Sequence, residues 1–383
     1  MTIKAAGSQL KFSEIEAEFG SNPGRSLGRY RSTHPDFTNE SPSGSSLSNL
    51  PLDTGIPTSG QIKFSNFYSK KLNMVVDYYG DTTNLNKQAA GNNTMAATWR
   101  YNNQSERVKV VGGYRSRPLG STNASYALSA SDWQGGKRVI INVNQTVGGK
   151  KDVAINDVAL RTGSWPSGTE LQVDIGSSGY LTGGGGNGGG ASPGLQGSNG
   201  FPGGNGTSAL GIEYAATINN GGVIRCGYGG GGGGSGAAND PSDKSDTDYG
   251  RSGGGGGGGA GLPVGGGGSG GTGGFNGDAP LNGDPGEAGL LTSGGDGGDA
   301  PSFEGANAGG GGAGGDFNDA PASGTTGTQG RPGVGYDAPG TGGPGGSDGK
   351  AIYFINATVE NNSTFTGNSV GGRNGGTTQG SFT

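Results

Sequence analysis

The pattern of apolar and polar residues changes along the chain. Near the start, Phe12, Ile15 and Phe19 lie at helical spacing before a glycine at position 20, which predicts a short helix. Further on, apolar and β-branched runs alternate with turn residues, which is typical of strands. These runs are 72–79, 108–114, 139–143, 153–160 and 171–175. Two late runs, 351–355 and 358–359, predict one or two closing strands.

Between 183 and 349 the regular feature is glycine. The chain has 93 glycines among 383 residues, and in this stretch many of them recur at every third position. A three-residue period matches the polyproline-II helix, which has three residues per turn and rises about 3.1 Å per residue. It fits neither an α-helix nor a strand. The evenly spaced sets are Gly194, Gly197, Gly200, Gly203 and Gly206; Gly265, Gly268, Gly271, Gly274 and Gly277; Gly283, Gly286 and Gly289; and Gly340, Gly343, Gly346 and Gly349.

A polyproline-II helix makes no hydrogen bonds within itself, so each buried N–H and C=O must pair with a neighbouring segment. Glycine lets such segments touch, because it has no side chain to hold them apart. We therefore expect a bundle of glycine-rich helices that are joined by backbone hydrogen bonds and have almost no apolar core. The alternatives are a collagen-like helix, which the 18 prolines and frequent phase breaks disfavour, and a flexible linker.

The tripeptide Asp-Ala-Pro recurs within this stretch and predicts regular reversals of the chain, because Asp and Pro favour turns. The copies are 21, 20 and 18 residues apart, and they start at Asp278, Asp299, Asp319 and Asp337. Two helices of about nine residues, roughly 28 Å each, fit between successive reversals. Aromatic residues lie near the reversals and in a longer insertion, 237–252: Tyr249, Phe275, Phe303, Phe317 and Tyr336.

The expected fold class is mainly β plus polyglycine-II, in four parts. Residues 1–72 form an N-terminal extended attachment segment, and 73–182 form a small β-sandwich-like domain. Residues 183–349 form a polyglycine-II bundle of packed polyproline-II-type helices with display loops, and 350–383 form the closing strands and a tail.

The attachment segment contains two similar pieces, 10–15 and 62–68, which are separated by Ser-, Pro- and Asn-rich chain. Such a segment cannot bury much surface alone. We expect its apolar side chains to dock on a partner subunit, with packing on the next domain as the alternative. The expected docking residues are Phe12, Ile15, Phe19, Phe64, Phe67 and Tyr68.

Composition and charge disfavour several classes of function. One cysteine, Cys226, allows no disulfide within the chain and no cysteine zinc site. No apolar run is long enough for a transmembrane helix, and the first residues lack a signal-peptide core, so we expect assembly in a cytoplasm. Residues 183–349 hold 15 acidic and 4 basic residues, a net charge of −11 in a chain of net charge −5. We expect this half to repel nucleic acid.

An enzyme is not expected. The single histidine, His34, lies in a polar stretch, and no G-x-S-x-G motif accompanies it. Paired carboxylates need a walled cleft to act on glycosides, which a glycine bundle without a core does not supply. The aspartates from Asp240 to Asp248 offer oxygen ligands for Ca²⁺, but their spacing does not match an EF-hand. We expect no cofactor and no metal.

Several stretches resemble tailed-bacteriophage virion proteins. The pairing of a Phe-Ser-Glu-Ile piece with 56–68 is similar to the start of many such proteins, and 163–169, 217–224 and 349–367 resemble their glycine-rich tail-fibre and tail-tip domains. The glycine part also resembles the polyglycine sandwich of distal tail-fibre adhesins of T-even-like phages, whereas the N-terminus does not resemble their fibre-capping domain.

The resemblance implies a receptor-binding protein of the virion tail, in which a rigid scaffold displays loops that bind the host surface. The implied partners are other tail or baseplate proteins and a bacterial surface glycan or outer-membrane protein, without nucleic acid or membrane insertion; a homotrimer is common among fibres. Because aromatic rings stack on sugars and carboxylates bond hydroxyl groups, the expected receptor-binding residues are Tyr249, Phe275, Phe303, Phe317, Tyr336, Asp278, Asp299, Asp319 and Asp337. The alternative is that the aromatic residues cap the end of the glycine bundle and the aspartates only form turns. The alternatives are a structural virion component of the collar, baseplate or head, and an ice-binding protein.

Overall fold

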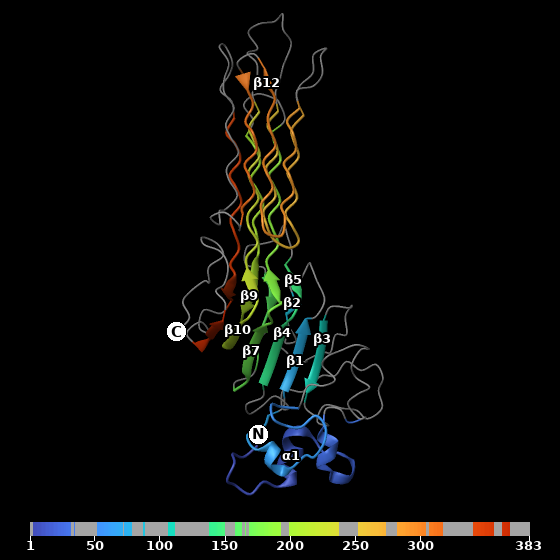
Figure 1. Cartoon of the computed structure of the whole chain (residues 1–383). Coiled ribbons are helices and arrows are strands. Elements are labelled where there is room, and N and C mark those ends of the chain that lie inside the picture. The colour runs from blue at the N-terminus through green and yellow to red at the C-terminus, as the bar shows by residue number, and fades with distance from the viewer. Residues whose placement is uncertain are drawn as a thin grey trace, which may run out of the picture.

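The computed structural model describes residues 3–31, 34, 52–71, 73–78, 87–88, 106–111, 138–149, 158–162, 165, 168–192, 199–236, 252–272, 282–303, 306–316, 340–355 and 362–367. These residues form three parts that follow one another along the long axis of the molecule (Figure 1). A small helical domain lies at one end, a β unit lies in the middle, and a bundle of slender rods extends to the other end.

The N-terminal domain is compact. It contains α1 (Phe12–Phe19) and the 3-10 helices η1 (Pro23–Arg25), η2 (Leu27–Tyr30) and η4 (Phe64–Phe67). The sequence prediction of a helix over 12–19 is confirmed, and Gly20 ends it with a positive φ of 81°. The prediction of an extended segment without a core is wrong, because four side chains from distant positions pack together with no exposed surface: Ile15, Phe19, Tyr30 and Phe67.

The strands occupy both halves of the chain. They are β1 (Asn73–Tyr78), β2 (Lys87–Gln88), β3 (Glu106–Val111), β4 (Arg138–Val143), β5 (Thr146–Gly148), β6 (Val158–Arg161), β7 (Glu170–Ile175), β8 (Tyr180–Thr182), β9 (Ser208–Ile212), β10 (Ala216–Asn220), β11 (Val223–Arg225), β12 (Ser302–Phe303), β13 (Ala306–Asn307), β14 (Ile352–Phe354) and β15 (Thr364–Gly367). Strands are confirmed within the predicted runs 72–79, 108–114, 139–143, 171–175 and 351–355, of which residues 72, 79 and 112–114 lie outside the described residues. The run 153–160 overlaps β6 only at its end, and 358–359 also lies outside the described residues.

The β unit is a parallel solenoid and not the predicted sandwich. Its sheets have the orders β15-β10-β7-β4-β1-β3, β11-β8-β5 and β14-β9-β6-β2, and among these strands only β3 pairs antiparallel. Each circuit of the chain therefore adds one strand to each sheet, as β4, β5 and β6 do, followed by β7, β8 and β9. A sandwich within 73–182 cannot form, because these sheets are completed by strands from 208–225 and 352–367.

The solenoid core consists of stacked rows of apolar side chains. Strand β4 alternates between half-buried and buried positions, and β7 alternates in the same phase. Because neighbouring strands pair in register, Val139 lies beside Leu171, and Val173 lies between Ile141 and Ile218. The alternation places polar residues such as Gln172 and Thr217 on the outer face of the sheet. The sheet with the order β15-β10-β7-β4-β1-β3 is called sheet A below.

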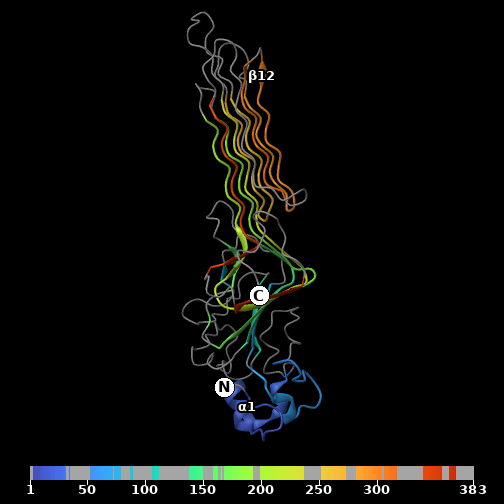
Figure 2. The ribbon, with the colours of Figure 1, turned by 90° about the vertical axis from the view of Figure 1, so that its left-hand side faces the viewer.

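Nine described segments without helix or strand structure form the bundle and lie side by side in both views (Figures 1 and 2). We number these rods in chain order: 183–192, 199–207, 227–236, 252–261, 264–272, 282–290, 293–300, 308–316 and 340–350. Rods 1 and 2 connect β8 to β9, and rods 3 to 9 lie between β11 and β14. The bundle is therefore a pair of insertions in two circuits of the solenoid, and not a domain that follows the β unit in sequence.

Backbone hydrogen bonds join the rods at every third residue. Rod 1 donates from Gly183, Gly186, Gly189 and Ser192 to the carbonyls of residues 225, 228, 231 and 234, over N···O distances of 2.8 to 3.2 Å. The intervening positions 185, 188 and 191 donate to residues 263, 266 and 269 on the other side. Each rod therefore uses successive residues to bond different neighbours.

The number of neighbouring rods explains the two glycine patterns of the sequence. Rod 4 exchanges backbone hydrogen bonds with rods 1, 3, 5, 6, 7 and 8 and is thus enclosed on all sides. Its sequence is an unbroken run of glycine from Gly253 to Gly259, and a Cβ on any of these would lie within 3.0 Å of a backbone atom of another rod. Among the described residues, rod 6 bonds only rods 4, 5 and 7, and it keeps glycine at every third position: Gly283, Gly286 and Gly289.

Side chains replace a neighbouring rod at several places on the bundle surface. The amide oxygen of Asn187 accepts the N–H of Gly266 at 2.7 Å, and those of Asn199 and Asn205 accept backbone N–H groups of rod 9. The carboxylate of Asp348 accepts the N–H of Gly229 at 2.9 Å and is 5% exposed. These side chains satisfy donors that would otherwise be left unpaired.

An ionic network joins the N-terminal domain to the solenoid. Asp53, which is 4% exposed, accepts the N–H of Lys71 at 3.0 Å and a guanidinium N–H of Arg138 on β4 at 3.0 Å. Arg138 also bonds Glu170 on β7, which pairs with the Lys71 ammonium. Burial of Glu170 opposes its ionisation, but the Lys71 and Arg138 charges and hydrogen bonds outweigh this effect and lower its pKa.

We expect Arg138→Gln to loosen this joint. The change removes the one charge that bridges Asp53 and Glu170, and Asp53 keeps only backbone donors, so the free energy of unfolding should fall by about 1–2 kcal/mol. Denaturant unfolding of the full chain measures the change. Arg138→Gln should also increase proteolytic cleavage around residue 71, where the two domains join. The matched control is Arg161→Gln, which breaks the ion pair with Glu213 between β6 and the end of β9 and should leave this cleavage unaltered. Equal cleavage there in both variants would contradict the bridging role.

Candidate functional site

The far end of the bundle gathers the ends of many rods. Hydrogen bonds between Ser192 and Gly234, between Gly254 and Gly309, and between Asp284 and Asp299 join these ends to one another. The β12–β13 hairpin also lies at this end, the furthest from the N-terminal domain (Figure 1). The described residues that flank positions 193–198, 237–251 and 273–281 all lie here. This set of rod ends is called the distal end below.

Most of the predicted receptor-binding residues cannot be placed in the structure. Tyr249, Phe275, Phe317, Tyr336, Asp278, Asp319 and Asp337 lie outside the described residues. Phe303 belongs to β12 at the distal end, although the structure describes only its backbone. Asp299 lies at the end of rod 7 with an exposed side chain. The structure thus brings Phe303 and Asp299 to one end of the bundle.

The structure does not support Phe317 and Asp319 as part of a receptor site at the distal end. Rod 8 runs from the distal end back to the solenoid, since Gly309 bonds Ser235 and Gly315 bonds Gly229. Asp316, the last described residue before Phe317 and Asp319, therefore lies at the solenoid end of the bundle. Gly340, the first described residue after Tyr336 and Asp337, begins rod 9 at the distal end. The sequence pattern predicts that Phe317, Asp319, Tyr336 and Asp337 lie near Phe303. Of these, only Tyr336 and Asp337 have a described neighbour at the distal end.

Rods 6 and 7 form an acidic edge that sequence reasoning did not single out. Asp284 donates its N–H to the carbonyl of Asp299 at 2.8 Å, and Glu287 does the same to Asp296 at 2.8 Å. All four carboxylate side chains are exposed. Along each rod the acidic residues are three positions, or about 9 Å, apart. This edge repels phosphates and offers acceptors to hydroxyl groups.

The predicted attachment residues divide into two groups. Ile15, Phe19 and Phe67 have no exposed surface, so they stabilise the domain and cannot contact a partner while it stays folded. Phe64 is 40% exposed, and its ring lies 6.2 Å from that of Phe12, which is half-buried. Tyr68 is half-buried and donates its hydroxyl to the carbonyl of Ser8 at 2.7 Å.

Arg25 completes this surface and was missed by the sequence argument. Its guanidinium carbon lies 5.4 Å from the centre of the Phe12 ring, and it pairs with Glu16 at 2.8 Å. The signal was absent from the sequence, because Pro23-Gly24-Arg25 reads only as a turn. Phe12, Phe64 and Arg25 are called the basal patch below.

The titratable groups between the solenoid and the bundle are structural. Arg225 is 2% exposed and lies 4.3 Å above the centre of the Tyr180 ring, and burial lowers its pKa to about 10, which leaves it charged at neutral pH. Burial raises the pKa of the Cys226 thiol, so this side chain is unreactive. Burial also raises the pKa of Tyr228, which packs against Cys226.

The described residues place two further limits on the site. No three His, Cys, Asp or Glu side chains among them come together as a metal site, and Asp240 to Asp248 are not included in that set. Within the same residues, none of the helices has the length and apolar character needed to cross a bilayer.

Comparison with known proteins finds a similar solved structure but no related sequence. No protein-family model matches the sequence, and no curated protein matches it. Among solved structures, the gp37–gp38 adhesin tip complex of the bacteriophage S16 long tail fibre is similar, with 18% sequence identity over 95% of this chain and 96% of that chain. The TM-score is 0.38, and a similarity of this degree does not show a common fold.

Proposed function

We propose that this chain is a bacteriophage tail-fibre or tail-tip protein that binds a receptor on the host surface. In this proposal the distal end carries the receptor-binding loops, the bundle is a polyglycine-II scaffold that holds them, and the basal patch attaches the chain to the virion. The role is adhesive and not catalytic, and the receptor is a surface glycan or an outer-membrane protein. The observation that carries the proposal is the convergence of the rod ends at the distal end.

The bundle suits a display scaffold because its stability does not depend on the loops. Hydrogen bonds at every third residue tie each rod to two or more others, so a change in one loop leaves the rods in place. This three-residue repeat of the bonds supports the polyglycine-II assignment. Binding residues are commonly found on loops held by a rigid frame.

The two ends of the molecule suit two different contacts, one with the virion and one with the host receptor. The N-terminal domain presents the partly exposed aromatic rings of the basal patch, which suit a protein partner. The full length of the rods separates the distal end from that domain (Figure 2). A chain attached through the basal patch thus holds its distal end away from the particle.

An adsorption assay tests the proposal. Replacing Tyr249, Phe275 and Phe303 together with alanine should abolish binding of the full chain to host cells, because aromatic side chains supply most of the contact energy at such surfaces. Binding of labelled protein to cells measures the effect. The control replaces Asp296 and Glu287 with alanine, on the acidic edge, and should keep binding within about twofold. Normal adsorption by the triple variant would remove the proposed site.

A further inference from the structure

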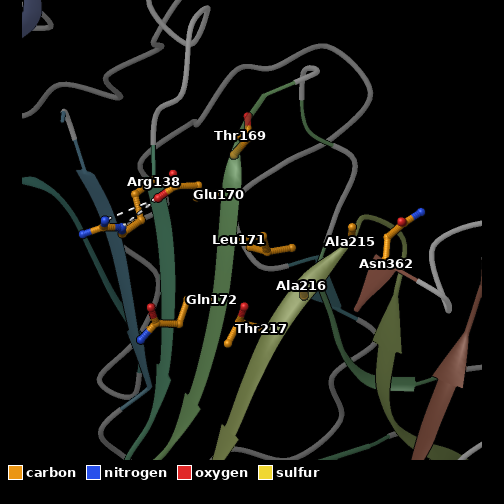
Figure 3. Close-up of a pocket in the computed structure, with 9 residues that line it drawn as sticks. All are labelled: Arg138, Thr169, Glu170, Leu171, Gln172, Ala215, Ala216, Thr217 and Asn362. Atoms are coloured by element: carbon orange, nitrogen blue, oxygen red, sulfur yellow. Dashed lines mark hydrogen bonds and ion pairs between the residues drawn. The ribbon is translucent and has the colours of Figure 1, made fainter. Parts of the chain in front are cut away.

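A polar groove on sheet A lies far from the distal end and is not part of the proposed receptor contact. It has a volume of about 290 Å³ and lies where β7 and β10 begin (Figure 3). The residues that bound it come from β4, from β7 and the residue before it, from β10 and the residue before it, and from the segment that leads into β15. They include Arg138, Thr169, Glu170, Gln172, Thr217 and Asn362.

We propose that this groove binds one unit of a neutral sugar. The lining offers hydroxyl, amide and carboxylate groups around a small apolar surface made by Ala215 and Ala216. A pyranose ring presents the same combination, with hydroxyl groups at its rim and C–H groups on its faces. The volume of about 290 Å³ is just below the range for sites that take drug-sized molecules, about 300–1,000 Å³, which fits a single ring.

Thr169 points to a ligand independently of the shape of the groove. The residue is 7% exposed, and its hydroxyl oxygen is buried without a hydrogen-bond partner among the residues that the structure describes. Such a group costs about 1–3 kcal/mol when it stays unpaired. Rotation of the Thr169 side chain about χ1 would turn this oxygen toward the groove, where a sugar hydroxyl would supply the missing bond.

The surroundings argue against other classes of ligand. Strand β7 pairs with β4 on one side and β10 on the other, so its backbone cannot take up an extended peptide. The guanidinium of Arg138 is already engaged with Asp53 and Glu170, so the described residues that line the groove offer no free cation to a phosphate. Because the charges of Arg138 and Glu170 cancel, the groove is neutral overall and suits a ligand without a net charge.

The amide of Gln172 is held in place for such a ligand. Its nitrogen donates to both carboxylate oxygens of Asp174, at 2.8 and 2.9 Å, and Asn219 donates to the same carboxylate at 2.7 Å. These bonds fix the Gln172 side chain before a ligand arrives, which reduces the entropic cost of binding. The amide oxygen is the group that would accept a sugar hydroxyl.

Saturation-transfer NMR on the full chain tests this inference, with methyl glycosides of neutral hexoses and N-acetylhexosamines as probes. We expect at least one of them to bind saturably with a Kd on the order of millimolar. Thr169→Val should weaken binding about three- to tenfold, because it removes only the hydroxyl. Thr217→Val, at an exposed position, should weaken binding about twofold or more and covers the case in which the buried change impairs folding.

The control is Thr341→Val, which removes a hydroxyl at an exposed position on rod 9 of the bundle, outside the groove. It should bind the sugar as the unaltered chain does. Absence of saturable binding for every probe, or equal binding by the Thr217 and Thr341 variants, would overturn the inference. Cell adsorption does not enter this test, so failure of the proposed receptor contact would leave its result unaffected.

Discussion

Replacing Gly257 with alanine is expected to break the bundle at its centre. A Cβ at this position would lie well within 3.0 Å of the carbonyl oxygen of Gly295, so rods 4 and 7 would have to separate. Their separation removes the hydrogen bonds from Gly295 to Gly258 and from Gly298 to Gly255 and leaves buried backbone groups unpaired. We expect a loss of about 3 kcal/mol or more in the free energy of unfolding.

Calorimetry of the full chain measures this loss, with Gly190→Ala as the matched control. A Cβ at Gly190 meets only side chains, with Ser269 Oγ at 3.3 Å and a Phe201 ring carbon at 3.7 Å, and these can move. Alanine there should change the stability by less than about 1 kcal/mol. Equal effects of the two substitutions would mean that the close approach of rods 4 and 7 does not stabilise the bundle.

The second large effect is expected in the N-terminal domain. Phe67 has no exposed surface, and its ring lies 5.7 Å from that of Tyr30 and 6.0 Å from that of Phe19. Phe67→Ala leaves a cavity in this small core and should cost about 3–5 kcal/mol. The domain should then open while the solenoid stays folded, and limited proteolysis of the full chain should cut within residues 3–71.

Phe64→Ala distinguishes the surface role from the core role. Phe64 is 40% exposed, so its removal should leave the protease pattern unchanged. The same substitution should weaken assembly of the chain onto its virion partner if the basal patch is the attachment surface. Protease sensitivity of the Phe64 variant that equals that of the Phe67 variant would show that both rings belong to one core.

Local elements of the fold could be predicted from the sequence, whereas their assembly could not. The helix at 12–19 has apolar residues on one face and a glycine stop, β4 is rich in β-branched residues, and β7 alternates apolar and polar residues. The partners of these strands were beyond sequence reasoning, because β7 pairs with β10 across two inserted rods. A short-range pattern carries no information on such pairing, so a sandwich was the default expectation.

The glycine pattern is the exception, because it indicates how far each rod is surrounded by other rods. A run such as 253–259 predicts a rod enclosed by others, and a triplet pattern such as that of rod 6 predicts a rod at the surface. The triplet alone predicts a bundle, whereas the difference between the two patterns also predicts which rods lie inside it. That difference follows from the absence of space for a Cβ on any side of rod 4.

The candidate site was less predictable than the fold. Proximity of Asp-Ala-Pro copies to aromatic residues suggested one cluster, but rod 8 returns to the solenoid before Phe317. The groove on sheet A involves Arg138, Thr169 and Asn362, which are far apart in sequence and carry no common motif. Only the in-register stacking of the solenoid brings them together.

Amide hydrogen exchange in rod 4 tests the central claim most directly, namely that backbone hydrogen bonds between glycine rods hold the bundle together. Each of the eight N–H groups from Gly254 to Gly261 donates to a carbonyl of another rod. Exchange of the full chain followed by mass spectrometry should show these amides among the most protected in the protein, as slow as those of β4 and β7. Exchange at the rate of an unstructured glycine peptide would contradict the claim.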